Sequence, residues 1–289
     1  MISSPAFNKE GVAIVQCANC ETSYVQPLPP VELLNRIYAQ YGDSYFANEE
    51  KILIDYREDR FRRELRLLRR PIHEKILLDV GCSTGSFLKL ARRLGFSPVQ
   101  GIDIAPKSVE LTNAILGVGT AIVGDFSAGV FEANLFDIVT MWATLEHVPN
   151  PEAFIREARR VLKPGGLLLA SVPNRTSFSY RQLGSRWSLV SIEHLQYFSR
   201  RSLAAMVRRC GFQPIENIAV AFNPLMFLAD VSEHSERRQA DTNWQIKKSN
   251  RNARWRSNTV IGMVEKLLDH VLNRFSLGDL VIMSARKGQ

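Results

Sequence analysis

Two glycines and one aspartate form the clearest ligand-binding pattern in the chain. Gly81 and Gly85 follow the apolar run at residues 76–80 and precede a stretch with helical spacing. A glycine at a strand-to-helix turn lets the backbone reverse sharply and approach a ligand, and the N–H groups at the start of a helix face whatever is bound. Asp103 ends the next apolar run, 22 residues after Gly81, close to the ~20 at which a βαβ nucleotide site places a carboxylate that accepts hydrogen bonds from ribose hydroxyls. The three residues together predict a nucleoside-binding site.

Two histidines and one glutamate offer acid–base chemistry. Glu146 and His147 follow the apolar run at residues 136–141, and His194 lies in a later stretch rich in serine, arginine and aromatic residues. A neutral imidazole is a competent base near neutral pH, so either histidine could take the proton from a substrate hydroxyl. The alternative is that His147 caps a helix or fixes its loop.

These side chains need a sheet to position them, and the hydrophobic pattern predicts one. Short apolar runs alternate with segments of helical periodicity, which is typical of βαβ units and a parallel sheet. We therefore expect an α/β, doubly wound, Rossmann-like core. The expected strands are 76–80, 99–104, 121–123, 136–141 and 166–172, and the expected helices are 86–94, 108–116, 151–162 and 201–210.

The remaining segments predict three regions. Residues 1–30 form an N-terminal appendage with a lone Cys17-x-x-Cys20 pair, residues 31–74 form a helical cap, and residues 75–289 form the core domain. The core carries insertions at about 173–198 and 223–277, which are longer than ordinary connections. The second insertion contains an amphipathic helix at residues 260–271, which we expect to pack on the core. A last strand at residues 280–285 is expected beside the strand at 215–222.

Composition narrows the class of protein. The net charge is +8 and the pI about 9.5, a basic excess that fits an anionic partner but is modest for a chain of this size, so a nucleic acid is not the expected partner. Four scattered cysteines do not make a disulfide framework, and no stretch reaches the about 18 apolar residues of a membrane span. We expect a cytoplasmic protein with no transmembrane segment; the oligomeric state cannot be predicted from these patterns.

Five motifs, in this order, resemble those of class I S-adenosylmethionine (SAM)-dependent methyltransferases. They are Asp79-Val-Gly-Cys-Ser-Thr-Gly85, Gly101-Ile-Asp103, Gly124-Asp125-Phe126, Phe136-Asp137-Ile-Val139 and Leu162-Lys-Pro-Gly-Gly166. The Leu-Glu-His-Val run at residues 145–148 is similar to the ubiquinone-biosynthesis O-methyltransferase-like, small-molecule branch. The resemblance implies SAM as cofactor, S-adenosyl-L-homocysteine as product, and a seven-stranded sheet of order 3-2-1-4-5-7-6 with an antiparallel last strand.

The resemblance also implies which residues contact the cofactor. Asp79 and Gly81 would lie beside the methionine moiety, Asp103 would bind the ribose, and Asp125 with Phe126 would border the adenine. Ser83 stands where many members carry a glycine. The full set of expected cofactor residues is Asp79, Gly81, Cys82, Ser83, Gly85, Asp103, Ile104, Asp125, Phe126 and Trp142.

A metal ion is not predicted. In the quinone enzymes a further glutamate, three residues before the glutamate of the run, completes a divalent-cation site, and here that position is Ala143. Glu146 and His147 alone would be too few ligands for a hard cation. The Cys17-x-x-Cys20 pair resembles one knuckle of a zinc ribbon, but a structural zinc needs four ligands, so we interpret it as a remnant. The expected catalytic residues are His194, His147 and Glu146, with His194 slightly preferred because similar His-Leu-x-x-Phe segments lie near the substrate opening in the same relatives.

The predicted function is methyl transfer from SAM to a small-molecule acceptor. The preferred acceptor group is a hydroxyl, and a sugar or a secondary metabolite is the kind of molecule that could carry it. An NAD-linked oxidoreductase is one alternative, but the chain lacks Gly-x-Gly-x-x-Gly. An RNA-directed methyltransferase, binding through the basic runs at 62–70 or 247–256, is another. A non-catalytic scaffold that keeps the fold is the third.

Overall fold

The computed structural model describes residues 2–9, 12–30, 32–34, 36, 61, 63–68, 73–191, 193–222, 224–232 and 259–288. Most of the helical cap expected at residues 31–74, and the charged middle of the insertion expected at 223–277, lie outside the described residues. In the part of the cap that is described, residues 32–34 and 36 are helical and a 3-10 turn, η2 (Glu64–Leu67), lies further along the chain.

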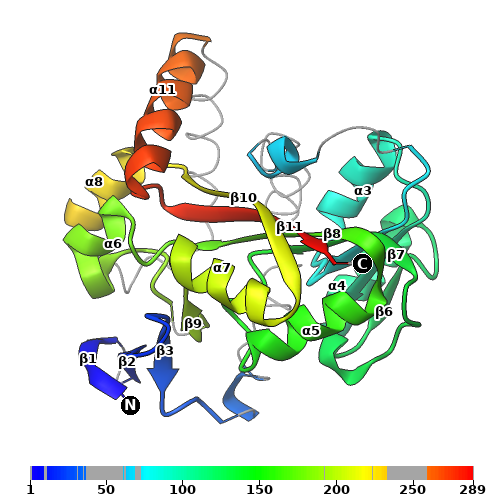
Figure 1. Ribbon diagram of the computed structural model, residues 1–289, viewed down its shortest axis with the longest axis horizontal. Helices are drawn as coiled ribbons and strands as arrows, with labels where there is room; N and C mark the ends of the chain where they lie inside the picture. Colours follow the sequence, from blue (N-terminus) through cyan, green and yellow to red (C-terminus); the bar gives the residue numbers. More distant parts are fainter. Residues whose placement is uncertain are drawn as a thin grey trace.

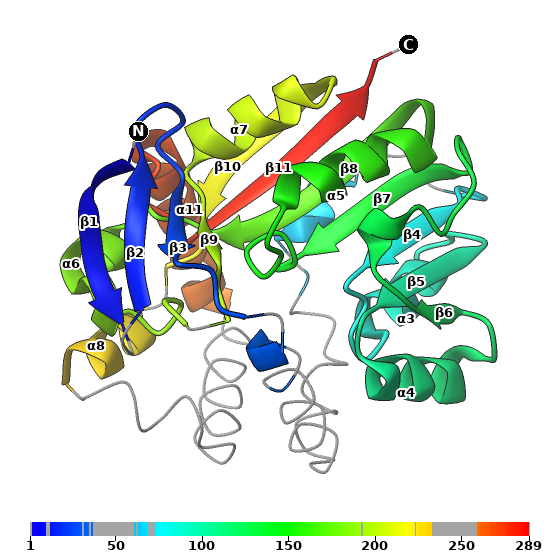
Figure 2. The same cartoon turned by 90° about the horizontal axis from the view of Figure 1, so that it is seen from below.

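The core is a seven-stranded sheet (Figures 1 and 2). Its spatial order is β10-β11-β8-β7-β4-β5-β6, and β11 runs antiparallel to both of its neighbours while the other pairs are parallel. Counted within the domain from the β6 edge, this is the order 3-2-1-4-5-7-6, so the predicted topology is confirmed. The strands are β4 (Leu77–Val80), β5 (Val99–Asp103), β6 (Ala121–Val123), β7 (Phe136–Trp142), β8 (Leu162–Pro173), β10 (Phe212–Val220) and β11 (Leu280–Lys287).

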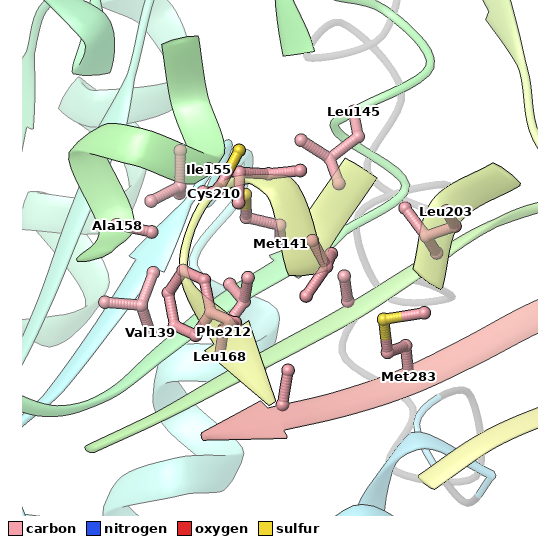
Figure 3. Close-up of a cluster of buried hydrophobic side chains, with 14 of the residues drawn as sticks. Val139, Met141, Leu145, Ile155, Ala158, Leu168, Leu203, Cys210, Phe212 and Met283 are labelled. Carbon is pink, nitrogen blue, oxygen red and sulfur yellow. The ribbon is translucent and has the colours of Figure 1, made fainter. Parts of the chain in front are cut away.

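Helices cover both faces of this sheet. On one face, α5 (Pro151–Val161) and α7 (Arg200–Arg209) bury their apolar side chains, as Figure 3 shows for Ile155, Ala158 and Leu203 beside strand residues. On the other, α3 (Ser86–Arg93) and α4 (Pro106–Leu116) pack a separate cluster. Leu78 belongs to the first cluster and Leu77 to the second, because successive strand side chains point to opposite faces. A strand buried on both faces explains the continuous apolar run of β4.

Local sequence explains where several helices begin. Pro106 and Pro151 start α4 and α5, since a proline in the first turn has no N–H to leave unpaired. Asn150 accepts a hydrogen bond from the Ala153 N–H at the start of α5. Ser199 and Ser202 form a reciprocal capping box at the start of α7. The chain therefore leaves the sheet at fixed points after β7 and before β10.

The N-terminal appendage is a second sheet, which the sequence patterns did not predict. Strands β1 (Ile2–Lys9), β2 (Val12–Cys17) and β3 (Ser23–Gln26) pair antiparallel, and β3 pairs with β9 (Gln196–Tyr197) of the first insertion. Figure 2 shows this sheet beside β9 and α6 (Phe178–Leu183). A cluster that includes Ile14, Val25, Trp187 and Tyr197 fills the space between them. The appendage is thus joined to the segment that carries His194.

The second insertion contributes α8 (Pro224–Ser232) and α11 (Thr259–Phe275). Asp269 of α11 is buried and accepts hydrogen bonds from the Ala221 N–H and from Arg63. Leu267 and Val271 are 67% and 45% exposed, and α11 projects away from the sheet (Figure 1). The expectation that this apolar stripe packs on the core is therefore wrong for its described side chains: the helix is anchored through a buried acid. Within the described residues, no helix combines the length and apolar character needed to cross a membrane.

Candidate functional site

The turn between β4 and α3 contains the glycines of the expected cofactor site. Gly81, Ser83 and Gly85 have φ angles of +72°, +48° and +73°, in a backbone region that residues with a Cβ rarely adopt. A Cβ on Gly81 would lie 2.8 Å from Thr144 Oγ1, and one on Gly85 would lie 2.7 Å from Thr112 Cγ2. Both glycines are therefore required by packing as well as by backbone conformation. Ser83, at the position where a glycine is common in the resembling family, adopts a conformation that a glycine favours.

Neighbouring elements hold this turn in place. The N–H groups of Gly81 and Cys82 donate to the Ile102 carbonyl at 2.8 and 3.2 Å. Thr112 Oγ1 of α4 donates to the Ser83 carbonyl, and Thr144 Oγ1 of the loop after β7 donates to the Val80 carbonyl, both at 2.9 Å. Sequence reasoning missed both threonines, because an isolated threonine in a helix or loop carries no distinguishing pattern.

Asp103 faces this turn from the end of β5. Its Oδ2 accepts a hydrogen bond from the Ser83 N–H at 2.8 Å, and its Oδ1 accepts one from the Ala105 N–H at 2.9 Å. Burial raises the pKa of Asp103 above its usual value, although the backbone N–H groups of Ala105 and Ser83 oppose that shift. The side chain is still partly exposed, and each carboxylate oxygen has a second lone pair for a ligand hydroxyl.

Apolar surface lies next to this carboxylate. Ile104 is 55% exposed and Val123 is 52% exposed, and Val123 is the register partner of Asp103 across β5 and β6. Three features of this edge fit the adenosyl group of the cofactor that the resemblance implies. The glycine turn leaves no room for a Cβ, Asp103 offers a carboxylate to ribose hydroxyls, and Ile104 with Val123 offers an apolar strip to a flat ring.

Two of the expected cofactor residues direct their side chains into the core. The Cys82 thiol is buried against Gly101, and burial raises the pKa of the Cys82 thiol far above its usual value. The Phe126 ring is 1% exposed and packs edge-on against Phe154. Contact of Cys82 and Phe126 with the cofactor stays a prediction, and their burial favours contact through the backbone.

Asp79 and Asp125 lie at the same edge of the sheet. Asp79 is 3% exposed, and Thr140 of the neighbouring strand β7 donates to its Oδ1 at 2.6 Å. Asp125 is exposed and accepts hydrogen bonds from the N–H and hydroxyl of Ser127, both at 2.8 Å, so it caps the 3-10 turn η3 (Phe126–Ala128). Contact of either carboxylate with a cofactor stays a prediction.

Trp142 is the last residue of β7, beside the glycine turn. Its ring meets Phe87 of α3 edge-on, with centroids 5.2 Å apart. The indole Nε1 is buried and has no hydrogen-bond acceptor among the described residues. A buried donor of this kind normally finds a partner, and a bound ligand would supply one.

Glu146, His147 and His194 come together in three dimensions although His194 is distant in sequence. One potential ligand atom from each lies within 4.8 Å of the others, and the two imidazole centroids are 4.6 Å apart. The Leu195 and Gln196 N–H groups donate to the Glu146 carbonyl at 2.7 and 3.0 Å, so backbone hydrogen bonds fix the two loops against each other. All three residues expected to be catalytic therefore occupy one place.

Burial favours the neutral forms of Glu146 and His147. It raises the pKa of Glu146, which is 1% exposed, to about 8. It also lowers the pKa of His147 well below its usual value, and the neighbouring His194 lowers it further. Neutral imidazoles beside a carboxyl group can accept a proton, orient a hydroxyl or bind a metal ion. The sequence predicts no metal here, but the structure adds a third possible ligand to the two that the sequence placed together.

Comparisons with known proteins agree with this geometry. A family model described as a methyltransferase domain matches residues 53–217. A ubiquinone biosynthesis O-methyltransferase of Bordetella avium is 30% identical over 171 residues, covering 54% of this chain and 69% of that protein. One from Cereibacter sphaeroides is 28% identical over 177 residues, covering 56% and 70%.

Solved structures show the same fold. A SAM-dependent methyltransferase from Thermotoga maritima, described as a possible histamine N-methyltransferase, superposes with a TM-score of 0.55 at 18% identity, covering 87% of this chain and 99% of that one. A putative methyltransferase from Bacillus halodurans superposes with a TM-score of 0.53 at 19% identity, covering 80% and 100%.

Proposed function

This chain belongs to the methyltransferase domain family and is a SAM-dependent methyltransferase, and from that premise we propose that it methylates a hydroxyl group of a small molecule. The relatives it resembles are named O-methyltransferases of ubiquinone biosynthesis. A sugar or secondary metabolite is the kind of acceptor we expect. A cytoplasmic location stays a prediction.

One observation carries the proposal: Thr144 joins the cofactor turn to the group of ionisable side chains. Its hydroxyl donates to the Val80 carbonyl at the end of β4, and Glu146 follows it by two residues in the same loop. Strands β4 and β7 are parallel neighbours, so both loops emerge at the carboxyl edge, where ligands bind in open α/β sheets. A donor held by the turn and an acceptor held by Glu146, His147 and His194 would then be adjacent.

The residues divide into two roles in this proposal. Gly81, Ser83 and Gly85 provide the backbone cradle, and Asp103 accepts hydrogen bonds from the ribose hydroxyls. When bound, SAM supplies an electrophilic methyl group on a sulfonium. Transfer from a sulfonium is a direct displacement, so alignment of donor and acceptor supplies much of the rate.

The acceptor side needs a group that handles the hydroxyl proton. Glu146, His147 and His194 are that group in our proposal, with His194 the preferred proton acceptor. Burial favours the neutral imidazole form of His147, which is the form that accepts a proton.

The test combines a binding panel with a product assay. The full chain is titrated with SAM, S-adenosylhomocysteine and NADH, and extracts of small molecules are then incubated with SAM carrying an isotope-labelled methyl group. We expect binding of the first two ligands only, and a mass gain of one labelled methyl on a hydroxyl-bearing metabolite. Label in RNA, or binding of NADH instead of SAM, would refute the proposal.

A further inference from the structure

Cys17 and Cys20 lie together at the tip of the hairpin between β2 and β3. Strand β2 ends at Cys17, and the chain returns as β3 at Ser23. Both cysteines are free and partly exposed, whereas Cys82 and Cys210 are buried. The thiols of Cys17 and Cys20 are within hydrogen-bond reach of each other. The hairpin therefore presents two accessible sulfur atoms side by side.

Backbone hydrogen bonds fix the turn that positions these sulfurs. The Cys17 N–H donates to the Thr22 carbonyl, and the Glu21 N–H donates to the Cys17 carbonyl, both at 2.9 Å. The Cys20 thiol also donates to the Thr22 hydroxyl at 3.4 Å. Two cysteines can be bridged without a large backbone movement when their side chains point toward each other. Thiols that contact each other meet this condition.

The Cys17 sulfur has the surroundings of a reactive thiol. The backbone N–H groups of Cys20 and Asn19 face it and lower the pKa of the Cys17 thiol below its usual value, although burial opposes that shift. The thiolate is the nucleophile in disulfide chemistry, so a lowered pKa in an accessible thiol favours reaction. Burial instead raises the pKa of the Cys82 and Cys210 thiols. Of the four cysteines, Cys17 is thus the one best suited to attack.

We propose that Cys17 and Cys20 form a thiol–disulfide exchange site that reacts with low-molecular-weight disulfides. The Cys17 thiolate attacks one sulfur of a disulfide RSSR, which forms a mixed disulfide and releases one thiolate RS⁻. The Cys20 thiolate then attacks the Cys17 sulfur and releases the second RS⁻. The two protons lost by the cysteines convert both released thiolates to RSH. The pair is oxidised to one intramolecular disulfide, and RSSR is reduced to two thiols.

Metal binding is the other chemistry that a cysteine pair offers. A structural zinc needs four ligands, and within the described ranges no third cysteine, histidine or acidic side chain is placed to share an ion with this pair. The remaining cysteines, Cys82 and Cys210, are buried in the core. Exposed disulfides are the labile ones that serve regulation or catalysis. The arrangement therefore favours reversible oxidation.

The hairpin is joined to the segment that carries the proposed acceptor residues. Strands β3 and β9 pair (Figure 2), and the Val25 N–H donates to the Leu195 carbonyl at 3.0 Å. The Leu195 N–H in turn donates to the Glu146 carbonyl at 2.7 Å. The exchange site thus belongs to the same sheet as β9, although the exchange reaction does not depend on the proposed function.

The reaction is tested on the reduced full chain. The protein is freed of reductant and incubated with excess oxidised glutathione, and the remaining thiols are alkylated and mapped by mass spectrometry. We expect Cys17 and Cys20 to lose two hydrogen atoms together and to resist alkylation, and dithiothreitol to restore both thiols. Cys82 and Cys210 are internal controls that should stay reduced in the folded protein, because they are buried.

Single variants separate the two steps. Cys20→Ser should stop after the first step, with one glutathione on Cys17. Cys17→Ser should form an adduct at Cys20 roughly tenfold more slowly, because the N–H groups that favour the thiolate face residue 17. Equal rates in the two variants would overturn the assignment of Cys17 as the attacking residue.

Three results would overturn the exchange site itself. The first is complete alkylation of Cys17 and Cys20 after treatment with the oxidant. The second is a glutathione adduct that forms on Cys82 or Cys210 before it forms on Cys17. The third is stoichiometric zinc, measured on the same samples, that protects the pair from oxidant and alkylating agent.

Discussion

The backbone N–H of Ser83 donates a hydrogen bond to the Asp103 carboxylate at 2.8 Å. This bond connects the loop after β4 to the end of β5, so the two halves of the proposed nucleoside site position each other. A preorganised site loses less free energy on ordering when the ligand binds.

Asp103→Asn should weaken binding of SAM and of S-adenosylhomocysteine. The amide has one acceptor oxygen instead of two and no charge, and hydrogen bonds to a charged group contribute about 1.5–3 kcal/mol, so we expect the affinity to fall roughly 10- to 100-fold. Calorimetric titration measures it. Glu110→Gln, an acid-to-amide change at an exposed side chain of α4, is the matched control. An unchanged dissociation constant in Asp103→Asn would remove this carboxylate from the site.

Gly81→Ala should be more harmful than Gly129→Ala. Both glycines have similar φ angles, +72° and +77°, so both substitutions carry the same backbone strain. Only at Gly81 would the new Cβ also meet a neighbour, Thr144 Oγ1 at 2.8 Å, whereas nothing lies within 4 Å at Gly129. We expect Gly81→Ala to abolish detectable SAM binding and Gly129→Ala to preserve it. Equal affinities in the two variants would contradict the close approach at the turn.

His194→Ala should reduce turnover without weakening SAM binding. The residue belongs to the group around Glu146 and not to the glycine turn, and removing a group that activates the acceptor typically costs about 10²–10⁴ in rate. Once the acceptor is known, kcat and the SAM dissociation constant are measured on the same preparation, with His270→Ala as control. Unchanged turnover would show that His194 is dispensable.

Asp137 should make stability depend on pH in the acid range. Burial raises its pKa, but the Ile76 N–H and Lys163 outweigh that effect, so the pKa of Asp137 lies below its usual value of 3.8. A lowered pKa means that the stabilisation is present above 3.8 and is lost as the pH falls through the folded-state value.

Urea unfolding of the wild type and of Asp137→Asn checks the sign. At neutral pH we expect the variant to lose about 1–3 kcal/mol of unfolding free energy, and the difference should shrink as the pH falls below 3.8. A difference that grows on acidification would contradict the assignment. Asp137 lies at the start of β7, away from the carboxyl edge, so SAM binding at neutral pH should be retained.

The capping box of α7 should contribute a measurable part of stability. Ser199 Oγ accepts from the Ser202 N–H at 3.1 Å, and replacing a serine cap by alanine typically costs about 1 kcal/mol. Ser199→Ala is therefore expected to lower the free energy of unfolding by about that amount. Arg201→Ala, at an exposed position in the same first turn, should have a smaller effect.

Local patterns predicted the sheet and the glycine turn after β4 well. Apolar runs bounded by glycine gave β4 and β5 to within a residue, and the spacing from Gly81 to Asp103 placed both at one edge. These features depend on residues close in sequence, where periodicity and turn chemistry act directly. The topology followed from the family resemblance and was confirmed.

Long-range contacts were beyond those patterns. The pairing of β3 with β9, and the meeting of His194 with Glu146, depend on backbone hydrogen bonds between segments far apart in the chain. Nothing in the spacing of His194 reveals its partner, so the sequence offers it only as an alternative base to His147. Likewise, Cys82 and Phe126 matched cofactor motifs by position, but strand and turn geometry send their side chains into the core.

A crystal structure of the full chain grown with S-adenosylhomocysteine tests the central claim most directly. We expect the ribose hydroxyls within hydrogen-bond distance of Asp103 and the adenine against Ile104 and Val123. The amino-acid moiety of the ligand should lie against residues 81–85. Density for the ligand at another place, or no ligand density beside residues 81–85 at saturating ligand, would contradict the assignment of this edge of the sheet as the methyl-donor site.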